Sequence, residues 1–148
     1  MERYDTEKAT RVWQRVRGSA EIQPAGVPGL QSLIADSLTQ AAYYQQLQRR
    51  LNGSSHALVQ KLTNQEKSIT ACLRGICTLV RGAPPAATPA NPTVETTEAL
   101  LRKCYRLALQ AATEYENRCD DAEYGQVFAR LAARKYDHCT AILELLGK

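Results

Sequence analysis

The chain has 148 residues, of which 44% are hydrophobic and 23% are charged, and its net charge is +4. These values are typical of one globular domain, and the charge forms no basic run that would indicate a nucleic-acid-binding protein. No apolar run approaches the roughly 18 to 20 residues of a membrane span, and the N-terminus MERYDTEKATR lacks the apolar stretch of a signal peptide. We therefore expect a cytoplasmic protein.

The five cysteines, at positions 72, 77, 104, 119 and 139, have no regular spacing and include no CxxC pair. This pattern indicates neither a disulfide framework nor a zinc site. We expect reduced thiols that serve mostly as small core residues.

Hydrophobic residues recur every three to four positions, and there is no sustained alternation of hydrophobic and polar residues. This pattern predicts an all-α protein. A short first helix is expected over residues 5–17, and a linker rich in proline and glycine follows it to residue 27. Packing onto the rest of the protein or onto a second subunit is the expected use of this helix. Residues 28–148 form the main domain.

Four long helices are predicted in that domain, over residues 28–52, 54–82, 91–118 and 120–147. The glycines at 53 and 82 end the first two helices, Ser54 or Ser55 caps the second, and Asp120 with Glu123 has the spacing of a capping box. The segment APPAATPANP cannot be helical and is long enough to cross a bundle. The expected fold is an antiparallel four-helix bundle of two αα-hairpins joined by a crossover.

The inward faces of these helices contain a faint internal repeat. Two positions recur after 71 residues, namely Ser37 as Ala108 and Tyr44 as Tyr115. Others recur after 69 residues, including Glu66 as Lys135 and Ile69 as His138. The full set of inward positions is Leu30, Leu33, Ser37, Gln40 or Ala41, Tyr44, Leu47, Leu51, Leu62, Glu66, Ile69, Leu73, Ile76, Val80, Leu101, Cys104, Ala108, Ala111, Tyr115, Leu131, Lys135, His138, Ile142 and Leu145. Polar residues thus interrupt otherwise apolar stripes.

This register matches that of bundle di-metal sites, in which two helices each supply a Glu and the other two each supply Glu-x-x-His. With the stretches LIADSLTQAAYY, ACLRGI and YGQVFARLAARKYDHC, the chain resembles the ferritin-like superfamily, in particular its rubrerythrin-related branch, over residues 28–147. The resemblance implies the ferritin-like bundle fold, homodimers, and a di-iron centre that reduces peroxide, oxidises ferrous iron or reacts with oxygen. The rubredoxin module of full rubrerythrins is missing, since there is no CxxC.

By this resemblance, six residues occupy the metal-ligand positions: Ser37, Glu66, Ile69, Ala108, Lys135 and His138. Tyr44 and Tyr115 would lie beside them. Only Glu66 and His138 are of ligand type. Because Ser37 and Ala108 are small, the Lys135 ammonium has room to reach Glu66, and a paired buried charge costs far less than an isolated one.

We therefore expect a buried Glu66–Lys135 pair, with His138 and the hydroxyl of Tyr44 or Tyr115, in place of a metal. Two alternatives remain open: Lys135 extends to solvent, or Glu66 and His138, with a cysteine, hold iron or manganese. His56 is expected to be exposed. A nucleophilic pair of His138 and Cys139 is not expected, because adjacent residues point about 100° apart on a helix.

The expected function is a non-catalytic structural or binding role without a cofactor. A di-metal oxidoreductase or iron-handling protein of peroxidase or ferroxidase type, with a rearranged metal site, is the alternative. An enzyme that uses the polar pocket without a metal is a third hypothesis. A specific partner is not indicated.

Overall fold

The computed structural model describes residues 29–83, 85–90 and 95–148, and within these ranges the chain is helical without a strand. The helices of this part are α2 (Leu30–Arg50), α3 (Gly53–Arg81), α4 (Thr97–Glu116) and α5 (Gly125–Leu146). The prediction of an all-α protein is confirmed for the described residues. The helix predicted over residues 5–17 and the domain boundary at residue 27 lie outside them.

The α2–α3 hairpin turns tightly after Arg50. Leu51 is extended, and Gly53 has a left-handed φ of 61°, which side-chain-bearing residues rarely adopt. Gly82 ends α3 with a φ of 74°, and its N–H donates to the carbonyl four residues earlier. The predicted end of α3 at Gly82 is confirmed, and a break between α2 and α3 is present, although α2 ends at Arg50 and not at residue 52. The predicted serine cap is wrong, since α3 already begins at Gly53 and Asn52 is its N-cap.

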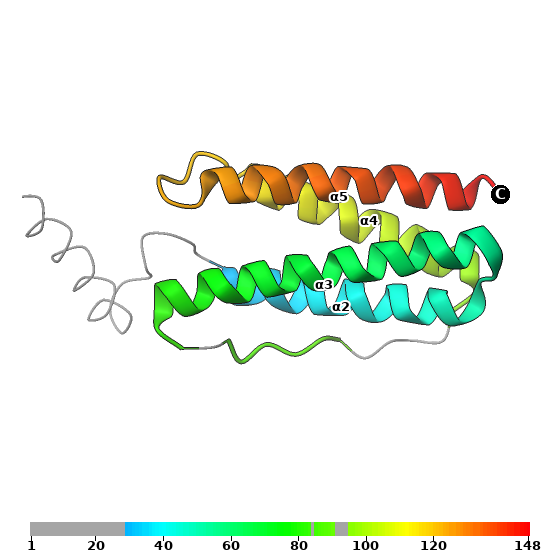
Figure 1. Ribbon diagram of the computed structural model, residues 1–148, viewed down its shortest axis with the longest axis horizontal. Helices are drawn as coiled ribbons and strands as arrows, with labels where there is room; N and C mark the ends of the chain where they lie inside the picture. The colour runs from blue at the N-terminus through cyan, green and yellow to red at the C-terminus, as the bar shows by residue number, and fades with distance from the viewer. Residues whose placement is uncertain (1–28, 84, 91–94) are drawn as a thin grey trace, which may run out of the picture.

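The described parts of the segment between α3 and α4 contact α2 at two points. The Ala90 N–H donates to the Thr39 hydroxyl (2.9 Å) in the middle of α2, and the Arg50 guanidinium, at the end of α2, donates to the Glu95 carbonyl (2.6 Å). Thr96 then caps α4, a few residues after the predicted start. As a result α4 runs in the same direction as α3, and α5 returns antiparallel to it (Figure 1).

The start of α5 differs from its prediction. Asp121 Oδ1 accepts hydrogen bonds from the backbone N–H groups of Glu123 (2.9 Å) and Tyr124 (2.7 Å). This Asx-type turn precedes the helix, which begins at Gly125. The predicted capping box of Asp120 and Glu123 at the start of the helix is therefore wrong.

Gly125 permits a close contact at this turn. A Cβ atom at position 125 would lie 2.2 Å from the carbonyl oxygen of Cys119, so the backbone would have to move. We expect Gly125→Ala to lower the free energy of unfolding by about 1–3 kcal/mol, as overpacking does. Gly75→Ala is the matched control, because a Cβ at position 75 meets nothing within 4 Å. Since alanine favours helix, the control should gain about 0.5–1 kcal/mol. Urea unfolding measures both, and equal stability of the two variants would contradict the clash.

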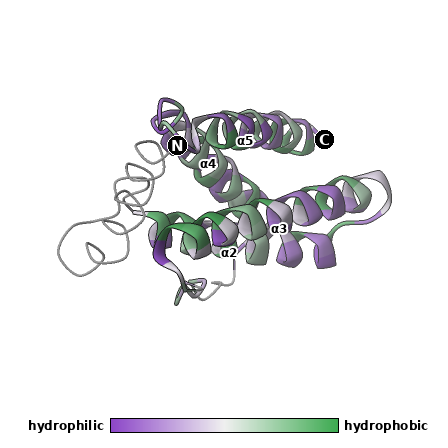
Figure 2. Ribbon diagram, turned by 60° about the vertical axis from the view of Figure 1, so that its left-hand side comes forward, coloured by the Kyte–Doolittle hydropathy of each residue, from purple (hydrophilic) through white to green (hydrophobic). Residues whose placement is uncertain are grey.

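Two apolar clusters fill the two ends of the helix bundle. The cluster at the start of α2 includes Leu33, Leu73 and Phe128, and the cluster toward the end of α2 includes Leu47, Leu100 and Ile142. Of the predicted inward positions only Leu51 and Ala111 are half-buried, and Ala112 is buried where Ala111 was expected. Each helix accordingly has hydrophobic and hydrophilic residues on different sides (Figure 2). Between the two clusters lies a layer of buried polar side chains.

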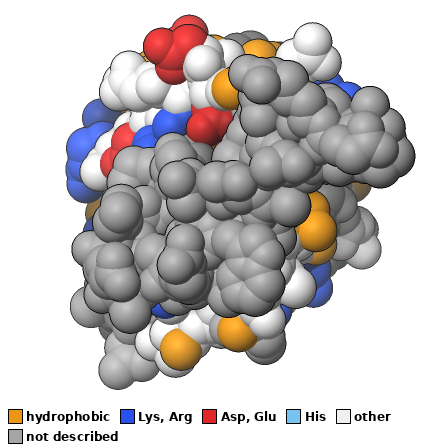
Figure 3. Space-filling model, turned by 90° about the vertical axis from the view of Figure 1, so that its left-hand side faces the viewer, with side chains coloured by type: hydrophobic (Ala, Val, Ile, Leu, Met, Phe, Trp, Pro, Cys, Tyr) orange, Lys and Arg blue, Asp and Glu red, His pale blue; other side chains and the backbone are white. Residues whose placement is uncertain are grey.

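Charge is divided unequally between the two hairpins. Residues 29–82 contain six lysines and arginines and two acidic residues, whereas residues 95–148 contain eight and nine. Figure 3 looks onto the end of the bundle that carries the α4–α5 turn, and acidic side chains are visible on its described surface. The α2–α3 hairpin is therefore the positive half of the described protein.

None of the helices in the described ranges is both long and apolar enough to cross a membrane.

Candidate functional site

The polar layer is built by residues on three helices. Ser37 comes from α2, Glu66 from α3, and Lys135 and His138 from α5, where the spacing of three residues puts both on one face. Their exposed fractions are 2%, 0%, 1% and 0%, respectively. The structure thus brings together four of the six positions derived from the internal repeat.

An ion pair lies at the centre of this layer. Lys135 Nζ is 2.5 Å from Glu66 Oε1, and the Ser37 hydroxyl donates to Glu66 Oε2 over 2.5 Å. Both carboxylate oxygens therefore have a donor, which is the condition under which a buried ion pair is tolerated. The predicted Glu66–Lys135 pair is present. The alternative in which Lys135 reaches solvent is wrong, because its side chain is buried.

His138 extends the network from the ion pair to α2 and to the edge of α3. Its Nε2 lies 3.0 Å from Gln65 Oε1, and its Nδ1 lies 3.1 Å from the Tyr44 hydroxyl. A carbonyl oxygen only accepts, so Nε2 carries a proton, and in the neutral ring Nδ1 accepts the proton of the Tyr44 hydroxyl. Both ring nitrogens therefore have a hydrogen-bond partner.

Burial lowers the pKa of His138 to about 3, and the positive charges of Lys135 and Arg134 act in the same direction. Glu66 Oε1 is 3.7 Å from His138 Nδ1 and would by itself favour a charged ring. Its charge is already compensated by Lys135 at the shorter distance of 2.5 Å. Desolvation therefore dominates, and His138 is neutral at physiological pH.

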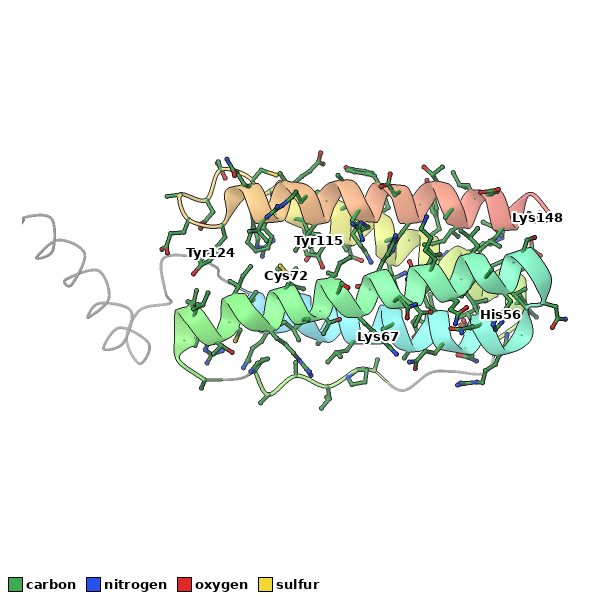
Figure 4. The ribbon with its side chains drawn as sticks, viewed as in Figure 1. His56, Lys67, Cys72, Tyr115, Tyr124 and Lys148 are labelled. Carbon is green, nitrogen blue, oxygen red and sulfur yellow. The ribbon has the colours of Figure 1, made fainter. Side chains whose placement is uncertain are left out.

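The two repeat-related tyrosines have different environments. Tyr44 is tied to His138, whereas Tyr115 packs its ring against Phe128, with 6.1 Å between the ring centroids, between the two hairpins (Figure 4). Burial raises the pKa of both phenols, and the negative charge of Glu66 adds to this effect. The sequence predicts the hydroxyl of either Tyr44 or Tyr115 as a partner of the polar layer, and in the structure it is Tyr44 that contacts His138.

The remaining two repeat positions carry no donor atom. Ile69 and Ala108 are buried, with 2% and 0% exposed, and each belongs to one of the apolar clusters. Ala108 lies on α4, so α4 supplies no polar side chain at the position that corresponds to a Glu in bundle di-metal sites.

Sequence reasoning missed two polar residues of this layer, Gln65 and Thr70, and left a third, Gln40, undecided. The Thr70 hydroxyl lies 2.7 Å from that of Ser37 and bonds to the Glu66 carbonyl, and Gln65 holds His138. Gln40, which the sequence offered only as an alternative to Ala41, is buried and donates to the Cys104 carbonyl (3.0 Å). Thr70 could have been predicted, because it lies four residues after Glu66 and therefore on the same face of the helix.

The cysteines do not add a reactive group to the layer. All five are free; Cys77, Cys104 and Cys139 are buried, Cys72 is half-buried and Cys119 is exposed. Burial raises the pKa of Cys104 to about 12 and also raises that of Cys139, so both thiols are protonated at neutral pH. The prediction that the cysteines are mostly core residues is confirmed, and the reduced state stays a prediction.

Among the described residues, no group of three or more His, Cys, Asp and Glu side chains is placed to hold a metal ion. Comparison of the chain with models of protein families, with curated proteins and with solved structures gave no match. A function for this chain is therefore inferred from the geometry of the polar layer.

Proposed function

We propose that the chain is a ferritin-like, rubrerythrin-related bundle protein in which a buried ion pair takes the place of a di-metal centre. Its role is non-catalytic, as a structural or partner-binding protein. The observation that carries the proposal is the 2.5 Å contact between Lys135 Nζ and Glu66 Oε1, with both side chains buried. A fixed internal cation at a carboxylate supplies the charge that a bound cation would otherwise supply.

The arrangement of the helices supports this relationship. The contacts of Ala90 and Glu95 with α2 and the directions of the four helices are those that a bundle of two hairpins with a long crossover requires. All six positions of the repeat are buried, and the four with polar side chains lie in the layer between the two apolar clusters.

The residues present do not fit a di-metal centre. Both oxygens of Glu66 and both nitrogens of His138 already have hydrogen-bond partners within the protein. A cation beside Glu66 would also face the Lys135 ammonium, and repulsion between like charges is strong at low dielectric. This supports a protein without a metal-based reaction, rather than the oxidoreductase alternative.

Metal content tests the proposal most directly. Protein produced in medium supplemented with iron and manganese should contain well under about one metal equivalent per chain, compared with the two of a filled bundle site. Inductively coupled plasma mass spectrometry measures this content. Stoichiometric iron with a ligand-to-metal absorption band would overturn the proposal and favour the oxidoreductase.

Restoring the ligands tests the register. The combined variant Ser37→Glu, Ile69→His, Ala108→Glu and Lys135→Glu should bind about two divalent cations, because it recreates two Glu and two Glu-x-x-His contributions. The matched control carries Gln instead of Glu at positions 37, 108 and 135 and should bind none. Circular dichroism establishes that both variants are helical. A helical restored variant without metal would count against the repeat.

The expected homodimer and the cytoplasmic location stay predictions. Analytical ultracentrifugation of the full chain tests the first.

A further inference from the structure

A pocket of about 500 Å³ opens between α2 and α3, away from the buried ion pair. Helix α2 contributes Gln45, Gln48 and Arg49, and α3 contributes mainly His56, Gln60, Asn64 and Lys67. Its volume lies within the range of about 300–1,000 Å³ of small-molecule sites. Its lining is polar, unlike that of most such sites, which indicates a hydrophilic ligand.

The charge of the pocket has one sign. Among the described residues that line it, none is acidic. Arg49 and Lys67 are exposed, and neither has an ion-pair partner in the described part of the chain. Of the two acidic residues in the hairpin, Glu66 is paired with Lys135, and Asp36 lies in a separate pocket beside Glu114 of α4. The positive potential of the pocket is therefore not compensated locally, and a concave surface concentrates it.

Part of the pocket wall is held in place by hydrogen bonds. The buried Thr63 hydroxyl is within hydrogen-bond distance of the Val59 carbonyl (2.9 Å) and of Gln48 Oε1 (3.3 Å). His56 Nδ1 lies 2.8 Å from the Gln48 carbonyl, and this contact fixes the ring. The prediction of an exposed His56 is wrong, since the residue is half-buried. These bonds reduce the ordering that a ligand would have to impose.

The lining side chains are of the types that recognise anions. The planar guanidinium of Arg49 can donate two parallel hydrogen bonds to a phosphate or carboxylate, and Lys67 supplies a point charge from the opposite helix. The amides of Gln60 and Asn64 add neutral donors. Figure 4 shows Lys67 near the middle of α3 and His56 near its first turn, and Figure 2 shows α2 becoming hydrophilic toward the hairpin turn.

We propose that this pocket binds a small polyvalent anion, either a phosphate compound or a polycarboxylate, between Arg49 and Lys67. The site is independent of the proposed loss of a metal centre, because it shares no lining residue with the Glu66, Lys135 and His138 network.

Titration calorimetry of the full chain with pyrophosphate and with citrate, at about 0.15 M salt, tests the proposal under conditions in which diffuse charge effects are screened. We expect saturable one-to-one binding of at least one of them, and the preferred probe identifies the anion as phosphate or carboxylate. Absence of saturable binding of both up to about 10 mM would overturn the proposal, since millimolar binding is already weak.

Substitutions locate the binding. Arg49→Gln and Lys67→Gln should each weaken it by about tenfold, which is the usual effect of losing one charge-assisted hydrogen bond. Arg74→Gln removes the same charge from an exposed position on α3 outside the pocket, and should change the affinity by less than about twofold. An equal loss in all three variants would show that only net charge matters, and an unchanged affinity in the first two would also refute the site. Circular dichroism controls for folding.

Discussion

Lys135→Met is expected to lower the free energy of unfolding by about 3–5 kcal/mol, because it leaves the Glu66 carboxylate buried without its countercharge. Methionine is close to the aliphatic part of lysine in shape, so the apolar packing around position 135 is largely retained. Ser37 would still donate to Glu66, but one neutral donor does not replace an ammonium at 2.5 Å. Urea-induced unfolding followed by circular dichroism measures the loss.

A double-mutant cycle separates the ion pair from packing. Glu66→Gln alone should be similarly destabilising, since it leaves the Lys135 charge unpaired, whereas Glu66→Gln with Lys135→Met should recover most of the loss. We expect the double variant within about 1–2 kcal/mol of the natural protein, because its remaining buried polar groups can still form hydrogen bonds. If the two single effects simply added, the two side chains would be energetically independent and the pairing would be refuted.

Stability should also fall steeply with acid because of His138. Its pKa is about 3 in the folded protein and about 6.5 when unfolded. Between these values the unfolded chain binds a proton that the folded protein does not, so this contribution to stability is complete above about pH 6.5 and decreases as the pH falls toward 3. At 1.36 kcal/mol per pH unit, the loss at pH 4.5 is about 2–3 kcal/mol relative to pH 7.

His138→Asn provides the comparison for this effect. The variant can still accept the Tyr44 proton through its side-chain oxygen, but it has no imidazole to protonate. It should be less stable than the natural protein at pH 7. Between pH 6.5 and pH 4.5, however, the variant should lose about 2–3 kcal/mol less of its free energy of unfolding than the natural protein loses. Unfolding midpoints across this interval measure the difference. Parallel pH profiles of the two proteins would show that carboxylates, and not His138, cause the acid sensitivity.

The helices and their inward faces could be predicted from the sequence. Spacing of three to four residues identifies the inward face of a helix regardless of what packs against it, so Ser37, Glu66, Lys135 and His138 were placed correctly. Gly53 and Gly82 marked helix ends because left-handed backbone there requires glycine. The starts of α4 and α5 were misplaced, since several Ser, Thr and Asp residues could serve as caps. Only the fold of the turns decides that Thr96 caps α4 and that Asp121 forms an Asx-type turn before α5.

The sequence by itself determined that the chain forms helices, which residues face inward, and that a lysine and a glutamate lie at matching positions of a repeat. Only the tertiary structure decided that Lys135 stays buried on Glu66, that Tyr44 rather than Tyr115 meets His138, and that the α2–α3 surface is hollow and basic. The physical reason is that helical periodicity fixes the direction of each side chain, whereas the atom that a long side chain reaches depends on how closely the helices pack.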